Sequence, residues 1–138
     1  MRLSPLFRYA IYAALAGLFV TGAAWLVVDR LKDTPAGDMW QSISADLLML
    51  HGGLTMVTLM LFGALFPLHI RLSWQRRKNR TTGVLMLSFN ALLIMTAFGL
   101  YYLGPEMLRP WMSWVHTIIG LSLPALAFTH ILIGRQNR

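Results

Sequence analysis

The sequence of 138 residues contains no cysteine. Structural disulfides, thiolate zinc sites and cysteine-ligated iron–sulfur clusters are therefore excluded. The same absence excludes covalent attachment of a c-type haem through a C-x-x-C-H motif. Any haem in this chain would have to be held non-covalently.

Charged residues are also scarce. Asp, Glu, Lys and Arg together make up 12% of the chain, whereas hydrophobic residues make up 57%. A soluble domain carries about 25% charged residues, and so few charges cannot cover the surface of a water-soluble globule of this size. The composition therefore predicts an integral membrane protein, and the length predicts a single domain comprising residues 1–138.

Four apolar stretches are long enough to cross a hydrocarbon core, which takes about 20 residues in a helix. Arg2 and Arg8 flank the first stretch in the manner of a signal peptide. Its apolar run exceeds the roughly 7–15 residues of such a segment, so we predict a retained helix. The predicted fold is all-α, with transmembrane helices at about residues 9–28, 46–70, 82–103 and 111–133.

The basic residues indicate the orientation of these helices. The connection between the second and third helices has five cations and no acid, whereas the other two connections mix both signs, and both termini are basic. The positive-inside rule then places the termini and the middle connection in the cytoplasm, which predicts an antiparallel four-helix bundle. The net charge of +7 belongs to this pattern, and nucleic-acid binding is not expected. The five cations are Arg71, Arg76, Arg77, Lys78 and Arg80.

The chain has four histidines, and all of them fall inside the predicted helices. His51 and His69 are separated by about 18 residues in the second helix, which at about 100° per residue returns to the same face. His116 and His130 are separated by about 14 residues in the fourth helix, about 40° short of full turns. Ionisable side chains are costly in a membrane, so we expect these four to face the bundle interior and to be functional.

The depths of the histidines predict how they pair. At a rise of about 1.5 Å per residue, His51 and His116 lie about 11 and 9 Å on the outer side of their helix centres. His69 and His130 lie about 16 and 12 Å on the inner side. We therefore predict that His51 pairs with His116, and His69 with His130, each pair as axial ligands of one b-type haem iron. Two alternatives stay open, namely hydrogen bonds to neighbouring helices and another metal ion such as zinc, copper or nickel.

Two glycines and three arginines are further candidates for haem contacts. Gly53 and Gly99 lie near the outer pair in depth and leave space for a porphyrin edge, although small residues also suit ordinary helix packing. Haem propionates need cations near the membrane surface. Arg71, Arg109 and Arg135 are candidates for that role, although membrane topology also explains their positions.

Two prolines interrupt the apolar stretches. Pro67 precedes His69 by two residues, and Pro124 lies between His116 and His130. Each proline removes a backbone donor and tends to kink its helix, and such breaks are tolerated in membranes. They serve either to re-aim the inner histidines or to adjust ordinary helix packing.

At these residues the sequence resembles the four-helix di-haem core of membrane cytochromes b and the small bacterial cytochrome b561-like proteins. In that family the second and fourth helices each carry two histidines. The last helix here, Ser113-Trp-Val-His116 followed by His130 and basic residues, is similar to their final ligand helix. The resemblance implies an antiparallel bundle, two non-covalent b-type haems and a place in the bacterial cytoplasmic membrane. The spacing from His51 to His69 is one turn, about 6 Å, longer than is usual in the family.

These features together predict transmembrane electron transfer. Bis-histidine ligation leaves no open iron position, which favours outer-sphere electron transfer. A quinone or a partner redox protein would exchange electrons with the chain, and membrane lipid would surround it. Quinone-linked oxidoreductase activity and homo-oligomerisation stay open. The alternatives are a haem-bearing anchor subunit of a larger oxidoreductase complex, and a non-redox permease that passes metal ions or protons along its histidines.

Overall fold

The computed structural model describes residues 4–77, 79–102 and 106–136. Throughout these ranges the regular structure is helical, with no strand. Four helices are long and apolar enough to cross a membrane, with mean hydropathies between 1.8 and 2.0 in their most apolar windows. The prediction of an all-α membrane protein is therefore confirmed in helix content and helix length. Arg2, Lys78 and position 103, the predicted end of the third helix, lie outside the described ranges.

The observed helices are longer than the predicted apolar stretches. Polar and aromatic residues continue each helix beyond the run that matches the hydrocarbon core, as is usual where a helix enters the membrane interface. The second spanning segment extends over Gly37–Gln75 and is built from three consecutive elements. The elements are α1 (Pro5–Leu31), α2 (Gly37–Leu65), the π-helix η1 (Phe66–Ile70), α3 (Arg71–Gln75), α4 (Arg80–Tyr102) and α5 (Arg109–Gln136).

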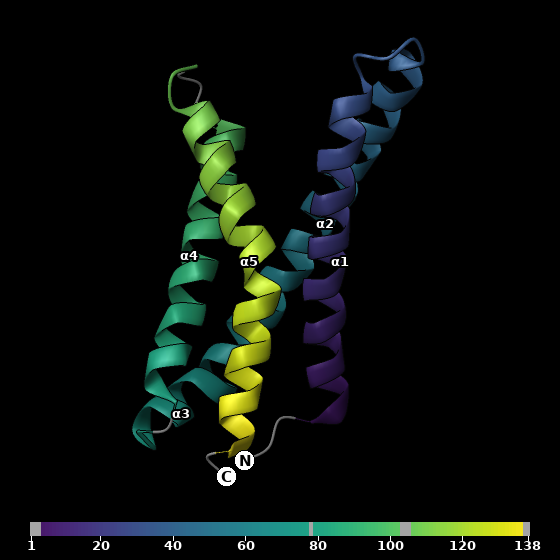
Figure 1. The fold of residues 1–138 in the computed structure, drawn as a ribbon. Coiled ribbons are helices and arrows are strands. Elements are labelled where there is room, and N and C mark those ends of the chain that lie inside the picture. Colours follow the sequence, from purple (N-terminus) through teal and green to yellow (C-terminus); the bar gives the residue numbers. More distant parts are fainter. Residues whose placement is uncertain (1–3, 78, 103–105, 137–138) are drawn as a thin grey trace. The chain divides into compact units, whose positions relative to one another are not determined.

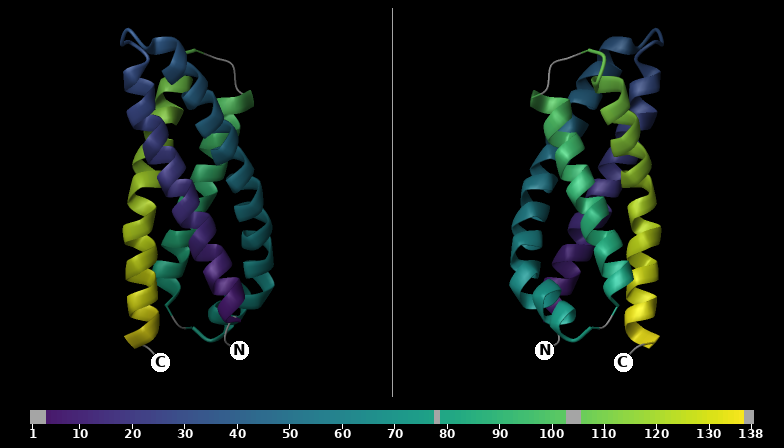
Figure 2. Two further views of the ribbon diagram at one scale, coloured as in Figure 1. Left: turned by 90° about the vertical axis from the view of Figure 1, so that its right-hand side faces the viewer. Right: turned by 90° about the vertical axis from the view of Figure 1, so that its left-hand side faces the viewer.

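The chain divides into two compact units, Met1–His69 and Ile70–Arg138. In the first unit α1 and α2 lie side by side and run in opposite directions, and in the second unit α4 and α5 do the same (Figures 1 and 2). Each unit is therefore a helical hairpin. The helices of the first hairpin approach closely at Gly17, where a Cβ atom would lie 3.1 Å from the side chain of Leu54.

The two ends of α1 are fixed by local interactions. The hydroxyl of Ser4 accepts a hydrogen bond from the backbone N–H of Phe7 at 3.2 Å, and proline follows in the first turn, where a helix has no use for an amide donor. At the other end Lys32 forms a 2.6 Å salt bridge with Asp29. The same ammonium group lies 5.8 Å from the centre of the Trp25 ring. These contacts hold the start of the connection to α2.

The second spanning segment changes its winding around Pro67. This residue and His69 lie in η1, which joins α2 to α3. Proline lacks the N–H that an α-helix requires at this point, and the segment continues through a π turn with i→i+5 geometry instead of ending. Pro124, by contrast, lies inside the continuous helix α5. Of the two predicted interruptions, only the one at Pro67 changes the helix type.

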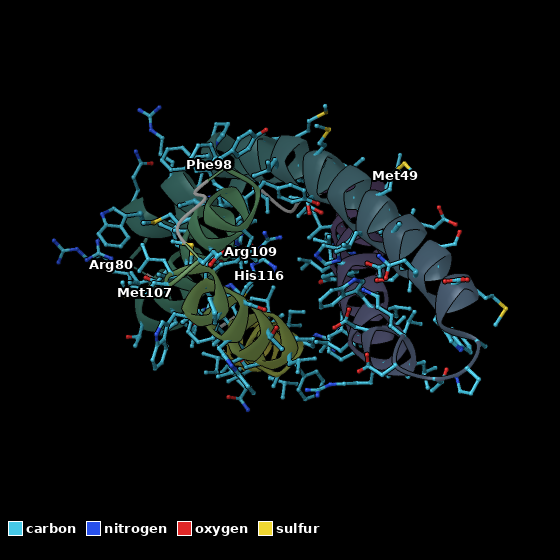
Figure 3. All side chains as sticks on the ribbon, turned by 90° about the horizontal axis from the view of Figure 1, so that it is seen from above. Met49, Arg80, Phe98, Met107, Arg109 and His116 are labelled. Atoms are coloured by element: carbon cyan, nitrogen blue, oxygen red, sulfur yellow. The ribbon has the colours of Figure 1, made fainter. Side chains whose placement is uncertain are left out.

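A tight turn connects α3 to α4. Arg77 and Asn79 adopt left-handed backbone conformations, with φ values of 56° and 53°, which are uncommon for residues other than glycine. Arg80 donates a hydrogen bond from Nη2 to the carbonyl of Trp74 at 2.9 Å, and its guanidinium lies 4.8 Å from the centre of the same indole ring. The Arg80 side chain is directed away from the second hairpin (Figure 3).

Most large apolar side chains of the described residues are exposed. Met49 and Met107 have exposed fractions of 72% and 81%, and the Met49 side chain projects away from α1 (Figure 3). Extensive apolar surface on a folded protein marks contact with a membrane or with another protein. Together with the four long helices, this surface indicates an integral membrane protein in contact with lipid.

Candidate functional site

The four histidines lie on two of the spanning segments. His51 is in α2 and His69 in η1, whereas His116 and His130 are both in α5. All four side chains are partly buried. Each predicted haem-binding pair takes one histidine from each hairpin, so the pairing stays a prediction. The geometry within each hairpin defines how the individual rings are held.

In the first hairpin, the ring of His51 is bonded to a threonine of the neighbouring helix. Thr21 Oγ1, on α1, lies 2.9 Å from His51 Nδ1. The Thr21 side chain is only 6% exposed, and its hydroxyl also donates to the backbone carbonyls of Gly17 at 2.8 Å and Leu18 at 3.2 Å. The hydroxyl therefore connects the imidazole to the backbone of α1.

The second hairpin repeats this arrangement at His116. Thr96 Oγ1, on α4, lies 2.9 Å from His116 Nδ1. The Thr96 hydroxyl donates to the carbonyls of Leu92 at 2.7 Å and Leu93 at 3.1 Å. The distances and the residue types match those around His51, so the two hairpins hold these rings in the same way.

His130 has a third contact of this kind. Its Nδ1 lies 2.9 Å from Thr82 Oγ1, which is near the start of α4. The Thr82 hydroxyl is 3.4 Å from the carbonyl of Asn79, a longer and weaker hydrogen bond than those of the other two threonines. Three of the four histidines thus have a threonine hydroxyl at Nδ1.

Two of these threonines are followed by a glycine, and a side chain added at that glycine would meet the same ring. A Cβ atom on Gly22 would lie 3.3 Å from His51 Cε1, and a Cβ atom on Gly83 would lie 4.0 Å from His130 Cε1. The Thr-Gly dipeptides of α1 and α4 therefore provide both a hydroxyl at Nδ1 and space for the adjacent ring edge. At His116 the residue after the threonine is Ala97.

The two glycines predicted to pack against a haem have different surroundings. Gly53 is exposed on α2, and a Cβ atom there would meet nothing within 4 Å. With Asp46, Met49 and Leu54, it lines an open groove along this helix. Gly99, on α4, is buried. Gly53 therefore has open space beside it whereas Gly99 is enclosed, and contact with a haem stays a prediction for both.

The three candidate propionate-binding arginines lie at helix ends. Arg71 begins α3, Arg109 begins α5, and Arg135 lies in the last turn of α5. All three side chains are exposed. The salt bridge found among the described residues joins Lys32 to Asp29. None of the three arginines forms a salt bridge with a described carboxylate. They are able to bind an anion at the membrane surface.

His69 lies in a π-helix, whereas the prediction that it shares a face with His51 assumed a continuous α-helix. His69 lies on the same helix face as His51 only if every turn between the two residues is α-helical. In η1 the winding is that of a π turn, whose hydrogen bonds join residues five apart instead of the four of an α turn. The face on which His69 lies is therefore not fixed by the α-helical period, and its role as a haem ligand stays a prediction.

The potential metal ligands among the described residues do not gather into a cluster. No group of three or more His, Cys, Asp or Glu side chains that would hold a metal ion is found among them. A protein site for a bare divalent ion usually needs at least three such ligands. A haem iron, by contrast, takes four ligands from the porphyrin and needs two histidines at most.

The sequence did not identify the threonines as partners of the histidines. The first and third predicted helices do share a pattern, Thr21-Gly22 in one and Thr96 followed by Gly99 in the other. For His51, His116 and His130, the sequence signal is a threonine at the same depth on the preceding helix. This signal is usable only once the register between the two helices of the hairpin is known.

Comparison with known proteins adds no family assignment. The sequence matches no family model, no curated protein and no solved structure. The resemblance to membrane cytochromes b therefore stays a prediction based on the four histidines. The functional argument rests on the way in which each hairpin holds its imidazoles.

Proposed function

We propose that this chain transfers electrons across a membrane through two b-type haems, each held by two histidines. The observation that carries the proposal is the repeated contact between a threonine hydroxyl and histidine Nδ1, at 2.9 Å in all three cases. Metal-ligating histidines almost always use the second ring nitrogen in a hydrogen bond that fixes the ring. Three intramembrane imidazoles held in this way are suited to bind iron through Nε2.

The proposed pairs follow from depth in the membrane. His51 and His116 form the outer pair, and the two rings have matching threonine partners, Thr21 and Thr96. His69 and His130 form the inner pair. The proposed arrangement is an antiparallel four-helix bundle with both termini and the Arg-rich connection in the cytoplasm, in agreement with the positive-inside rule.

The donor set favours haem over a bare metal ion. Each pair offers two imidazoles, and the described residues contain no third histidine or carboxylate to complete a protein-only site. When bound, a bis-histidine b-type haem supplies one-electron transfer at an iron without an open coordination position. Exposed apolar side chains such as Met49 would face lipid and exclude water from the helices that would hold the haem.

The chain's charged residues fit the ends of such an electron path. Arg71 and Arg135 lie near the proposed inner pair along the sequence, and Arg109 lies near the outer end of α5. Guanidinium groups bind carboxylates through paired, charge-assisted hydrogen bonds. These three arginines would hold haem propionates at the two surfaces, and a quinone or a redox protein would exchange electrons there.

An absorption spectrum tests the proposal directly. The full chain is expressed with haem supplied, purified in detergent and reduced with dithionite. We expect a Soret band, a sharp low-spin α band, and about two haems per chain in a pyridine haemochrome assay, because two histidine pairs are present. A colourless protein that is folded by circular dichroism would refute the proposal and favour a permease.

A further inference from the structure

We propose that Thr21, Thr96 and Thr82 set the tautomer of their histidines, so that the ring proton lies on Nδ1 and the lone pair on Nε2. They are positioning residues, because each acts through a histidine. The part of this inference that concerns iron rests on the proposed function. The tautomer itself follows from the hydrogen bonds within each hairpin and does not require a bound haem.

The number of protons at Thr21 determines the direction of its bond to His51. A threonine hydroxyl carries one proton, and a backbone carbonyl is an acceptor only. The 2.8 Å contact from Thr21 Oγ1 to the carbonyl of Gly17 therefore takes that proton. We assign the accepting role to the hydroxyl oxygen at the 2.9 Å contact with His51 Nδ1, a contact whose direction depends on the tautomer, so the inferred ring hydrogen lies on Nδ1.

The same count applies in the second hairpin. The Thr96 hydroxyl gives its proton to the carbonyl of Leu92 at 2.7 Å, and its oxygen accepts from His116 Nδ1 at 2.9 Å. At Thr82 the competing carbonyl, that of Asn79, is 3.4 Å away. The hydroxyl proton of Thr82 is held less firmly there, so we expect His130 to show the smallest tautomer preference of the three.

The glycine next to the threonine keeps the ring in place. His51 Cε1, the carbon between the two ring nitrogens, lies 3.3 Å from the position of a Cβ atom on Gly22. The hydrogen bond at Nδ1 limits rotation of the imidazole, and the missing side chain at Gly22 leaves room for the Cε1 edge of the ring. The direction of Nε2 is thereby defined by α1, although His51 itself belongs to α2.

This arrangement has two chemical consequences. In a neutral imidazole with its proton on Nδ1, Nε2 carries the lone pair that a metal ion binds. A hydrogen bond from Nδ1–H also raises the basicity of the ligand, which stabilises oxidised iron relative to reduced iron. Loss of the hydroxyl is therefore expected to weaken haem binding and to raise the reduction potential of the haem on that histidine.

The first test uses the protein without haem. Histidine is labelled with ¹⁵N, and the ring nitrogens are observed by NMR in detergent at a pH where imidazole is neutral. The His51 signals are identified by their loss in His51→Ala. We expect Nδ1–H in the wild type, a shift toward Nε2–H in Thr21→Val, and retention of Nδ1–H in Thr21→Ser. Thr58→Val is the matched control, since the Thr58 hydroxyl donates to the carbonyl of Leu54 within α2.

The second test uses the haem-loaded protein. Thr21→Val should bind the haem on His51 roughly 10–100-fold more weakly, the usual cost of losing a partner behind a metal ligand. It should also raise the midpoint potential of that haem, while Thr21→Ser and Thr58→Val behave like the wild type. A merely structural role for Thr21 would lower the amount of folded protein without moving the potential of the haem that remains.

The two tests separate this inference from the proposed function. If the wild type binds no haem but His51 is Nδ1–H and responds to Thr21→Val, the proposed function fails and the tautomer assignment stands. If the wild type binds two haems and His51 is Nε2–H, or Thr21→Val changes neither tautomer nor potential, the inference is overturned and the proposed function stands.

Discussion

Thr21 and His51 are 30 residues apart in the sequence, and their side chains meet at 2.9 Å across the first hairpin. Thr96 and His116 are 20 residues apart and meet at the same distance across the second hairpin. In both cases the threonine is on the first helix of the hairpin and the histidine on the second. The two hairpins therefore share this local geometry, although the contact in the first hairpin lies further from the turn than the contact in the second.

Removal of single histidines tests the proposed pairing. His51→Ala and His116→Ala should each lower the haem content from about two to about one per chain, because each removes an axial ligand of the outer haem. The double variant should also keep about one haem, since both residues serve the same iron. Pyridine haemochrome assays and redox titrations measure this. A double variant without haem, from single variants that each keep one, would contradict the pairing.

Gly22→Ala tests whether the outer ligand depends on close packing. The added Cβ atom would lie 3.3 Å from His51 Cε1, so the ring has to move by a few tenths of an ångström. Overpacking of this kind costs about 1 kcal/mol, which corresponds to roughly fivefold weaker haem binding. Gly63→Ala is the control, because a Cβ atom there meets nothing within 4 Å. Equal haem titration curves for both variants would argue against the role of Gly22.

Pro67→Ala tests the role of the π turn. With the missing N–H restored, the segment is able to close as an α-helix, and the change of winding within Phe66–Ile70 turns His69 relative to α2. We expect loss or a changed spectrum of the inner haem and an unchanged outer haem, resolved by redox titration. Pro124→Ala, in the continuous helix α5, should leave both haems in place. An unaltered inner haem in Pro67→Ala would show that His69 is not oriented by η1.

The absence of cysteine makes the predicted orientation directly measurable. Single cysteines at Asp33, Gln75 and Met107 place one thiol in each connecting region, and all three positions are exposed. A membrane-impermeant maleimide added to intact cells should label Asp33→Cys and Met107→Cys, but Gln75→Cys only after permeabilisation, because the Arg-rich connection is expected inside. The opposite labelling pattern would invert the proposed topology.

Hydropathy and charge were sufficient to predict the four membrane-spanning helices and to draw attention to the four histidines. Both are local properties, since about 20 apolar residues must be helical in a bilayer whatever they pack against. The extent of the helices was underestimated, because the polar ends of Gly37–Gln75 and Arg109–Gln136 continue the helix where hydropathy has already fallen. The proline at position 67 predicted a break but not its form as a π turn.

The partners of the histidines were decided by tertiary structure alone. Whether Thr21 meets His51, or Thr82 meets His130, depends on the rotation and offset of two packed helices. Those quantities are set by contacts such as that of Gly17 with Leu54 and by the connection that joins the helices, not by the periodicity of either helix. The sequence by itself determined which side chains enter the membrane, because hydropathy acts residue by residue. The packing of each hairpin decided which threonine hydroxyl meets Nδ1 of His51, His116 and His130, because a hydrogen bond requires two atoms to meet within about 3 Å.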